Sequence, residues 1–268
     1  MKPEDARFNA LISLLQDEDV RVASLAMEQL LQLGPVTEQT IAQYQDCHDP
    51  HLRQRMHQLA SILQRRQARR DFIEAVASEK MTVWAGVCRI TALYDPQIAL
   101  DTVEATVVSM GEDLAAGRAG AAQVAAVLRD WEFAVPEQDL LDVELYLADS
   151  VLESKYGSPV LLCVLGQEIG RRCGWNATVG LYEGRFCLID GGNLLLDPTS
   201  GWHITQMDSA DKFHPCGPKD VWLGVLSQLF LVALVEGQLR DLYHFGDLLT
   251  ALNDAGIEAL PPPLGRGE

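Results

Sequence analysis

The chain has 268 residues, of which 48% are hydrophobic and 22% are charged, as in an ordinary globular protein. No apolar run approaches the roughly 20 residues that a membrane-spanning helix needs. The N-terminus also lacks the basic-then-apolar pattern of a secretory signal, so we expect a cytoplasmic protein. The six cysteines include no CxxC pair, and we expect reduced thiols.

The net charge of −17 belongs entirely to residues 71–268, because basic and acidic side chains balance within residues 1–70. A domain this acidic repels phosphate groups, which argues against nucleic acid and anionic membranes as partners. We therefore expect a protein partner of basic character. The exposed arginines of residues 65–70 are read as a solvated helix face.

Residues 1–70 contain two segments that align when the sequence is shifted by 32 positions. Asp17 and Asp49 head the two segments, and each is followed by an arginine and by apolar residues at helical spacing. Either aspartate can cap a helix, and Pro50 suits a first helical position. The pattern resembles HEAT-type helical hairpins, although that class usually repeats every 40 residues or so. We expect a HEAT-like region that docks on the rest of the chain.

Four potential metal ligands lie close together in this region, namely Cys47, His48, His51 and His57. No second cluster completes such a site, so we expect surface histidines and no metal.

Residues 71–148 carry apolar stripes at helical spacing, which predict helices over 83–94 and 98–114. The small residues of 115–126 also permit a helix. The carboxylates here are spaced as solvated faces, and we see no catalytic pairing.

Residues 145–202 carry the strongest pattern. The helix that ends at Tyr156 is broken by Gly157-Ser158-Pro159, after which a helix capped by Ser158 runs to Gly174 and is apolar all round in its first half. Strands are then predicted near 177–181, 186–189 and 194–196, with Gly191-Gly192 as a hairpin turn. These elements predict an α+β, mostly helical fold in which a buried helix packs on a small antiparallel sheet.

The order of these motifs resembles the SirB-type transglutaminase-like family. The segment 151–162, VLESKYGSPVLL, is similar to that family's signature before its long helix. Gly184-Arg185-Phe186 and Asp197-Pro198 follow at the places of its Gly-His-Phe and Asp-Pro elements, and a closing helix is expected at 221–243 with a tail to Leu252. The resemblance divides the chain into HEAT-like repeats at 1–70, a transglutaminase-like domain at 71–252, and an extended or disordered tail at 253–268.

The resemblance also implies where catalytic groups would stand. Acyl transfer by a thiol needs a cysteine, a histidine base and an acidic residue to orient the base. The cysteine position falls on Pro159, the histidine position on Arg185, and only Asp197 is retained. An arginine stays protonated near neutral pH and cannot act as the base. Cys163 lies one turn into the helix and is expected to be a small buried hydrophobe.

The resemblance further predicts that Arg185 faces Asp197 as an ion pair in place of the histidine–aspartate pair. A two-residue Gly191-Gly192 loop would pair Arg185 with Pro198 and put Asp197 on the other face. A three-residue loop with a bulge would pair Arg185 with Asp197, and we favour this register.

We therefore expect a catalytically inactive transglutaminase-like scaffold that acts through protein contacts, without cofactor or metal. The alternative is a thiol hydrolase or acyltransferase with a rearranged site. That site would use Cys163 or Cys187, with Asp197 and a displaced histidine, His203 or His214. A small-ligand or metal site is the third possibility. Trp175, Trp202 and His203 are candidates for lining the cleft in which the family's catalytic groups would lie, although tryptophans are more often packed in the core.

Overall fold

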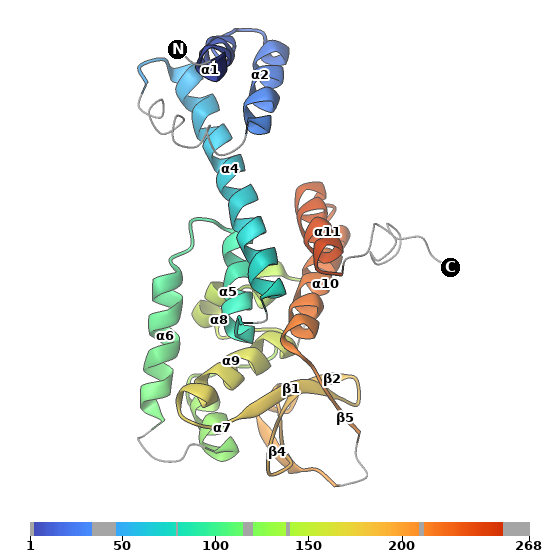
Figure 1. The fold of residues 1–268 in the computed structure, drawn as a ribbon. Helices are drawn as coiled ribbons and strands as arrows, with labels where there is room; N and C mark the ends of the chain where they lie inside the picture. The colour runs from blue at the N-terminus through green and yellow to red at the C-terminus, as the bar shows by residue number, and fades with distance from the viewer. Residues whose placement is uncertain are drawn as a thin grey trace, which may run out of the picture. The chain divides into compact units, whose positions relative to one another are not determined.

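The computed structural model describes residues 3–33, 47–78, 80–114, 120–137, 140–208 and 212–253 (Figure 1). It confirms an α+β, mostly helical fold with one small antiparallel sheet. The chain divides into two compact units, Met1–Asp71 and Phe72–Glu268. The division falls inside α4 (Pro50–Ala77), so a single helix passes through the boundary that we expect at residue 70.

The described part of the first unit contains α1 (Pro3–Leu14), α2 (Val20–Gln32) and the first part of α4. Its core is mainly aliphatic, with one phenylalanine, Phe8, and forms a cluster of its own; Leu15, Leu30, Met56 and Leu59 are fully buried in it. The Arg55 guanidinium on α4 donates to the carbonyls of Leu15 and Asp17, which ties α4 to the end of α1.

The helix caps of this unit correct one prediction. The carboxylate of Asp49 accepts a hydrogen bond from the His51 amide at 2.9 Å and caps α4, as the repeat pattern predicts. In the first segment the cap is Asp19, which accepts from the Arg21 amide at 2.8 Å. Asp17 instead accepts from the Asp19 amide, so α2 begins later than the alignment with Asp49 predicts.

The second unit has seven described α-helices after the end of α4 and two short 3-10 turns. The α-helices are α5 (Val83–Tyr94), α6 (Leu100–Asp113), α7 (Ala121–Asp130), α8 (Ala148–Ser154), α9 (Pro159–Arg172), α10 (Pro218–Glu236) and α11 (Leu239–Asn253), and the turns are η1 (Val143–Tyr146) and η2 (Pro198–Ser200). The predicted helices over 83–94 and 98–114 are confirmed. Residues 115–119 lie outside the described chain, as do residues 34–46 of the predicted repeat region and nearly all of the predicted tail.

The closing helix that we expect at 221–243 is in fact two helices. Gly237 adopts a left-handed conformation, with φ +71°, and ends α10 before α11 begins. Among the described helices, α10 is the one long and apolar enough to cross a membrane by length and composition. Its Val221, Trp222, Val225 and Leu226 are buried in the protein core. The core helix of a soluble protein can have the same length and apolar composition.

Helix α9 is the centre of the second unit. It packs against the helices α5, α6, α7 and α10 and against the strands β1 (Ala177–Tyr182) and β2 (Arg185–Asp190) (Figure 1). The Ser158 hydroxyl accepts from the Leu161 amide at 3.4 Å and caps the helix, and Gly174 follows its end with φ +82°. Both predicted ends of this helix are confirmed.

The sheet has five antiparallel strands in the order β4-β3-β2-β1-β5. The predicted strands are β1, β2 and β3 (Leu194–Asp197), which all form. Two edge strands were not predicted, β4 (His203–Gln206) and β5 (Phe213–Pro215). Leu188 and Leu196 belong to the main core with α9, whereas Cys187, Leu195 and Met207 form a separate small cluster.

Candidate functional site

The connection from α8 to α9 holds the residues that resemble the family signature. Lys155 ends α8 in a left-handed conformation, with φ +68°. Its ammonium lies 4.9 Å from the centre of the Trp131 ring and 5.0 Å from that of Phe133, a cation–π arrangement. A Cβ atom on Gly157 would come within 2.9 Å of Val151, so only glycine fits there. These signature residues therefore shape the entry into α9.

The N-terminus of α9 carries no thiol. Pro159 is its first residue and is partly exposed, whereas Cys163, one turn further on, is fully buried. Burial raises the pKa of the Cys163 thiol well above its usual value, and nearby Cys187 and Asp197 raise it further. Because the thiolate is the nucleophilic form, Cys163 is a poor nucleophile where it lies.

Arg185 and Asp197 form an ion pair, with 3.1 Å between a guanidinium nitrogen and a carboxylate oxygen. The same-face arrangement and the ion pair are as predicted, but the favoured register is wrong. Leu188 pairs with Leu196 and Ile189 with Leu195, so the next position places Asp197 opposite Cys187 and leaves Arg185 diagonal to it. Diagonal neighbours on one sheet face remain within reach of a long side chain such as arginine.

The hairpin loop explains this register. It has three residues, Gly191, Gly192 and Asn193, and Asn193 has φ +59°, the left-handed position that such loops require. The Asp190 carboxylate accepts from the amides of Gly192 at 2.8 Å and Leu194 at 3.0 Å. The three-residue loop is as predicted, but the strands are shifted by two residues from the direct pairing we favoured, which keeps Arg185 and Asp197 on the same face.

Asp197 is buried, and several groups occupy its oxygens. One oxygen accepts from the Thr199 amide at 2.8 Å and from the Thr199 hydroxyl, and the other faces Arg185. On the far side, His203 of β4 is its cross-strand partner. Cys187, Asp197 and His203 therefore lie in one row across three strands. The sequence hints at this only through the short connection between Asp197 and His203.

Cys187 is completely buried at one end of this row. Burial raises its pKa to about 12, Asp197 raises it as well, and Arg185 lowers it. The row also places the aspartate between the cysteine and the histidine, whereas a nucleophile has to contact its base. The arrangement does not provide an activated thiol.

The remaining predicted cleft residues take different places. Trp175 and Trp202 are both buried core residues; the indole of Trp202 donates to the Phe133 carbonyl at 2.7 Å, and that of Trp175 to Asp190 at 3.3 Å. His203 is exposed at the start of β4. His214 is exposed on β5, where it pairs with Leu181, at the opposite edge of the sheet from His203.

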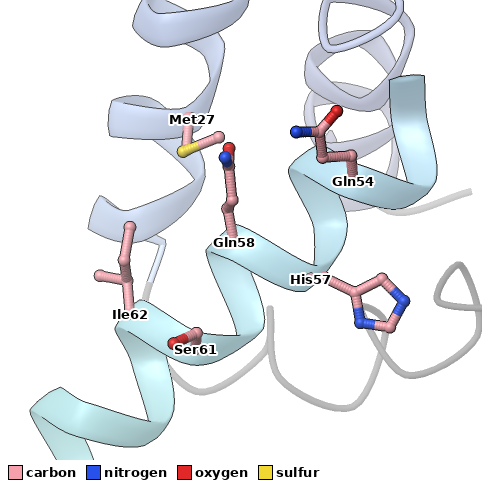
Figure 2. Close-up of a pocket in the computed structure, with 6 residues that line it drawn as sticks. All are labelled: Met27, Gln54, His57, Gln58, Ser61 and Ile62. Atoms are coloured by element: carbon pink, nitrogen blue, oxygen red, sulfur yellow. The ribbon is translucent and has the colours of Figure 1, made fainter. Parts of the chain in front are cut away.

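Each unit has a cavity that is open to solvent. The first, of about 640 Å³, lies in the first unit, where Met27 of α2 faces Gln58 and Ile62 of α4 (Figure 2). Its other lining residues are Gln54, His57 and Ser61. Across the described part of the chain, no three histidine, cysteine, aspartate or glutamate side chains converge as metal ligands, and this includes His57 and its neighbours.

The second cavity, of about 680 Å³, lies beside the N-terminus of α9, and we call it the η1 groove. Three segments line it: Ala134, Val135, Pro136 and Glu137; Asp142, Glu144 and Leu145; and Ser154 and Tyr156. Ser154 and Tyr156 belong to the signature-like segment 151–162, but the other lining residues did not stand out in the sequence, because they come from irregular segments without periodicity.

The chain was compared with known protein families, curated proteins and solved structures. A model of the transglutaminase-like superfamily matches residues 96–218, which extend from the loop before α6 to the start of α10. No curated protein and no solved structure matches the chain. Residues 96–218 therefore form a transglutaminase-like superfamily domain.

Proposed function

We propose that this protein is a catalytically inactive transglutaminase-like scaffold of the SirB type that acts through protein contacts, with HEAT-like repeats as its first unit. The observation that supports this most strongly is the Arg185–Asp197 ion pair. The resemblance expects a histidine base at Arg185, and here a guanidinium is held against the acidic residue that would orient that base.

The cysteines support the same conclusion. Pro159 stands where a nucleophile would benefit from the positive end of the helix dipole. Cys163 and Cys187, the two thiols nearest to Asp197, are fully buried, and burial raises the pKa of both. A thiol that is neither ionised nor accessible cannot form an acyl intermediate.

A thiol hydrolase or acyltransferase with a rearranged site is the second candidate. It is favoured by the row of Cys187, Asp197 and His203 on neighbouring strands. It requires a movement that exposes Cys187 and brings His203 past the aspartate.

An activated ester separates the two functions. The full chain is mixed with excess p-nitrophenyl acetate near pH 7.5, and nitrophenol release is followed from the first milliseconds. A scaffold gives no burst above that of the variant Cys163→Ala/Cys187→Ala. A burst of one equivalent that is lost in Cys187→Ala or in Cys163→Ala would overturn the proposal and establish the hydrolase instead.

A further inference from the structure

We propose that the η1 groove binds an extended segment of a partner protein that carries lysine or arginine side chains. The inference rests on the proposed scaffold function and names the chemistry of the partner. It is carried by the cavity itself, by the charge of its rim and by an exposed aromatic ring.

The groove has a rigid frame. The Ala134 amide donates to the Lys155 carbonyl at 3.0 Å, and the Gly157 amide donates back to the Ala134 carbonyl at 3.2 Å. The Ser158 amide donates to the Leu145 carbonyl at 2.9 Å, which joins the segment of Asp142, Glu144 and Leu145 to the start of α9. A cavity held open by backbone hydrogen bonds is preformed, so a ligand binds to it without the entropic cost of ordering its walls.

The rim of the groove carries only negative charge among its ionisable lining residues. Glu137, Asp142 and Glu144 are exposed, and no lysine, arginine or histidine lines the cavity. The nearest cation in the sequence is Lys155, whose ammonium donates to the Leu152 carbonyl and lies over two aromatic rings. The groove therefore complements a cationic ligand, and the net charge of −17 steers such a ligand toward it.

Tyr156 adds an aromatic wall. It follows the Lys155 cap directly and is 52% exposed, whereas Tyr146, on the neighbouring η1, is buried. An exposed tyrosine ring offers its face to an ammonium or guanidinium group. Val135 and Pro136 supply apolar surface for the aliphatic stem of such a side chain.

The binding experiment uses the full chain and a fluorescein-labelled peptide that alternates glycine with lysine and arginine. Fluorescence anisotropy measures its affinity, with a peptide that has glutamine in place of every basic residue as the ligand control. The groove variant is Glu137→Gln/Glu144→Gln. Asp142 is kept because its carboxylate caps η1 by accepting from the Glu144 amide.

The matched control variant is Glu28→Gln/Glu74→Gln, which removes two exposed carboxylates from α2 and α4 and so the same net charge. We expect the groove variant to weaken binding of the basic peptide about three- to tenfold, as two exposed ion pairs do, and the control variant to leave it within about twofold. Tyr156→Ser is expected to weaken binding by about two- to fivefold, the size of an exposed cation–π contact. Circular dichroism melting checks that each variant is folded.

Equal weakening by the groove and control variants would overturn the proposal, because the whole acidic surface would then attract the peptide without a site. Equal binding of the basic and glutamine peptides would overturn it as well. This experiment and the ester assay test different claims. If the ester assay shows no burst and the groove variant binds the basic peptide as well as the control variant does, only the class of partner is contradicted. An ester burst contradicts the scaffold function alone.

Discussion

The hairpin beside α9 and the η1 groove at its N-terminus differ in almost every physical respect. In the hairpin, Cys187 is fully buried and Asp197 nearly so, and an ion pair and hydrogen bonds occupy the carboxylate. In the groove, the carboxylates of Glu137 and Glu144 and the ring of Tyr156 face solvent. The hairpin, where catalytic groups would be expected, is therefore closed to solvent, whereas the η1 groove is open. This difference supports our proposal that the domain acts by recognition at its surface and not by chemistry in its interior.

The contrast between the closed hairpin and the open start of α9 is tested most strongly by restoring the cysteine and the histidine that the family resemblance expects. In the variant Pro159→Cys/Arg185→His, the introduced thiol occupies the partly exposed first position of α9, where the helix dipole favours a thiolate. At neutral pH it should be alkylated by iodoacetamide about a thousandfold faster than Cys187, whose pKa of about 12 leaves few thiolates. Mass spectrometry of digested samples gives both rates. Equal rates would mean that the start of α9 is as closed as the hairpin.

The closed region also predicts how stability depends on pH. Burial raises the pKa of Cys187 to about 12, and it does the same for Cys88, a partly buried thiol of α5 outside the hairpin, so the folded state keeps protons that the unfolded chain releases above a thiol pKa near 8.5. Each thiol therefore stabilises fully below pH 8.5, and between 8.5 and 12 each pH unit removes about 1.4 kcal/mol per thiol. Urea unfolding between pH 8 and 10 measures this fall. The slope should be shallower for Cys187→Ala, and an unchanged slope would place the thiol in contact with water.

Close packing under the hairpin side of α9 gives the next largest effect. A Cβ atom on Gly170 would lie 2.3 Å from the Trp175 ring, so Gly170→Ala should cost about 1–3 kcal/mol of unfolding free energy through overpacking. The matched control is Gly191→Ala in the hairpin loop, where a Cβ atom meets nothing within 4 Å. That variant should change stability by less than about 0.5 kcal/mol. Comparable losses in both would mean that Trp175 is not packed on α9.

The ion pair contributes least, because Arg185 is half-exposed and solvent screens it. Arg185→Gln should cost about 1 kcal/mol or less. Asp197→Asn should cost more, about 1–3 kcal/mol, because the buried carboxylate also accepts from Thr199. A double-mutant cycle by chemical denaturation gives the coupling between the two side chains. A coupling of zero would indicate that the pair is not formed in solution.

Much of the fold around α9 was predictable because local chemistry decides it. Ser158 and Pro159 start the helix, Gly174 follows its end, and the all-round apolar sequence between them requires burial. The edge strands β4 and β5 escaped prediction because they are short and largely polar, and they exist through pairing with β3 and β1. The break at Gly237 was missed because the apolar pattern continues across it.

For the candidate site, the sequence predicts which residues are present but not how they are arranged. The absence of a cysteine at Pro159 and of a histidine at Arg185 can be read from the family resemblance, and so can an ion pair with Asp197. The register could not, because it depends on the left-handed Asn193, and the observed shift of two residues makes Cys187 rather than Arg185 the residue opposite Asp197. The η1 groove was not predicted at all, since its walls come from three segments that meet only in the folded chain.

The pH profile of thiol alkylation in the unmodified protein tests the central claim most directly. Iodoacetamide is applied from about pH 5 to 9, and mass spectrometry locates the label on each of the six cysteines. We expect Cys163 and Cys187 to remain unlabelled throughout this range, with labelling confined to the partly exposed cysteines and rising toward the ordinary thiol pKa of about 8.5. Rapid labelling of Cys163 or Cys187 near pH 6 would reveal an activated thiolate and contradict the scaffold function.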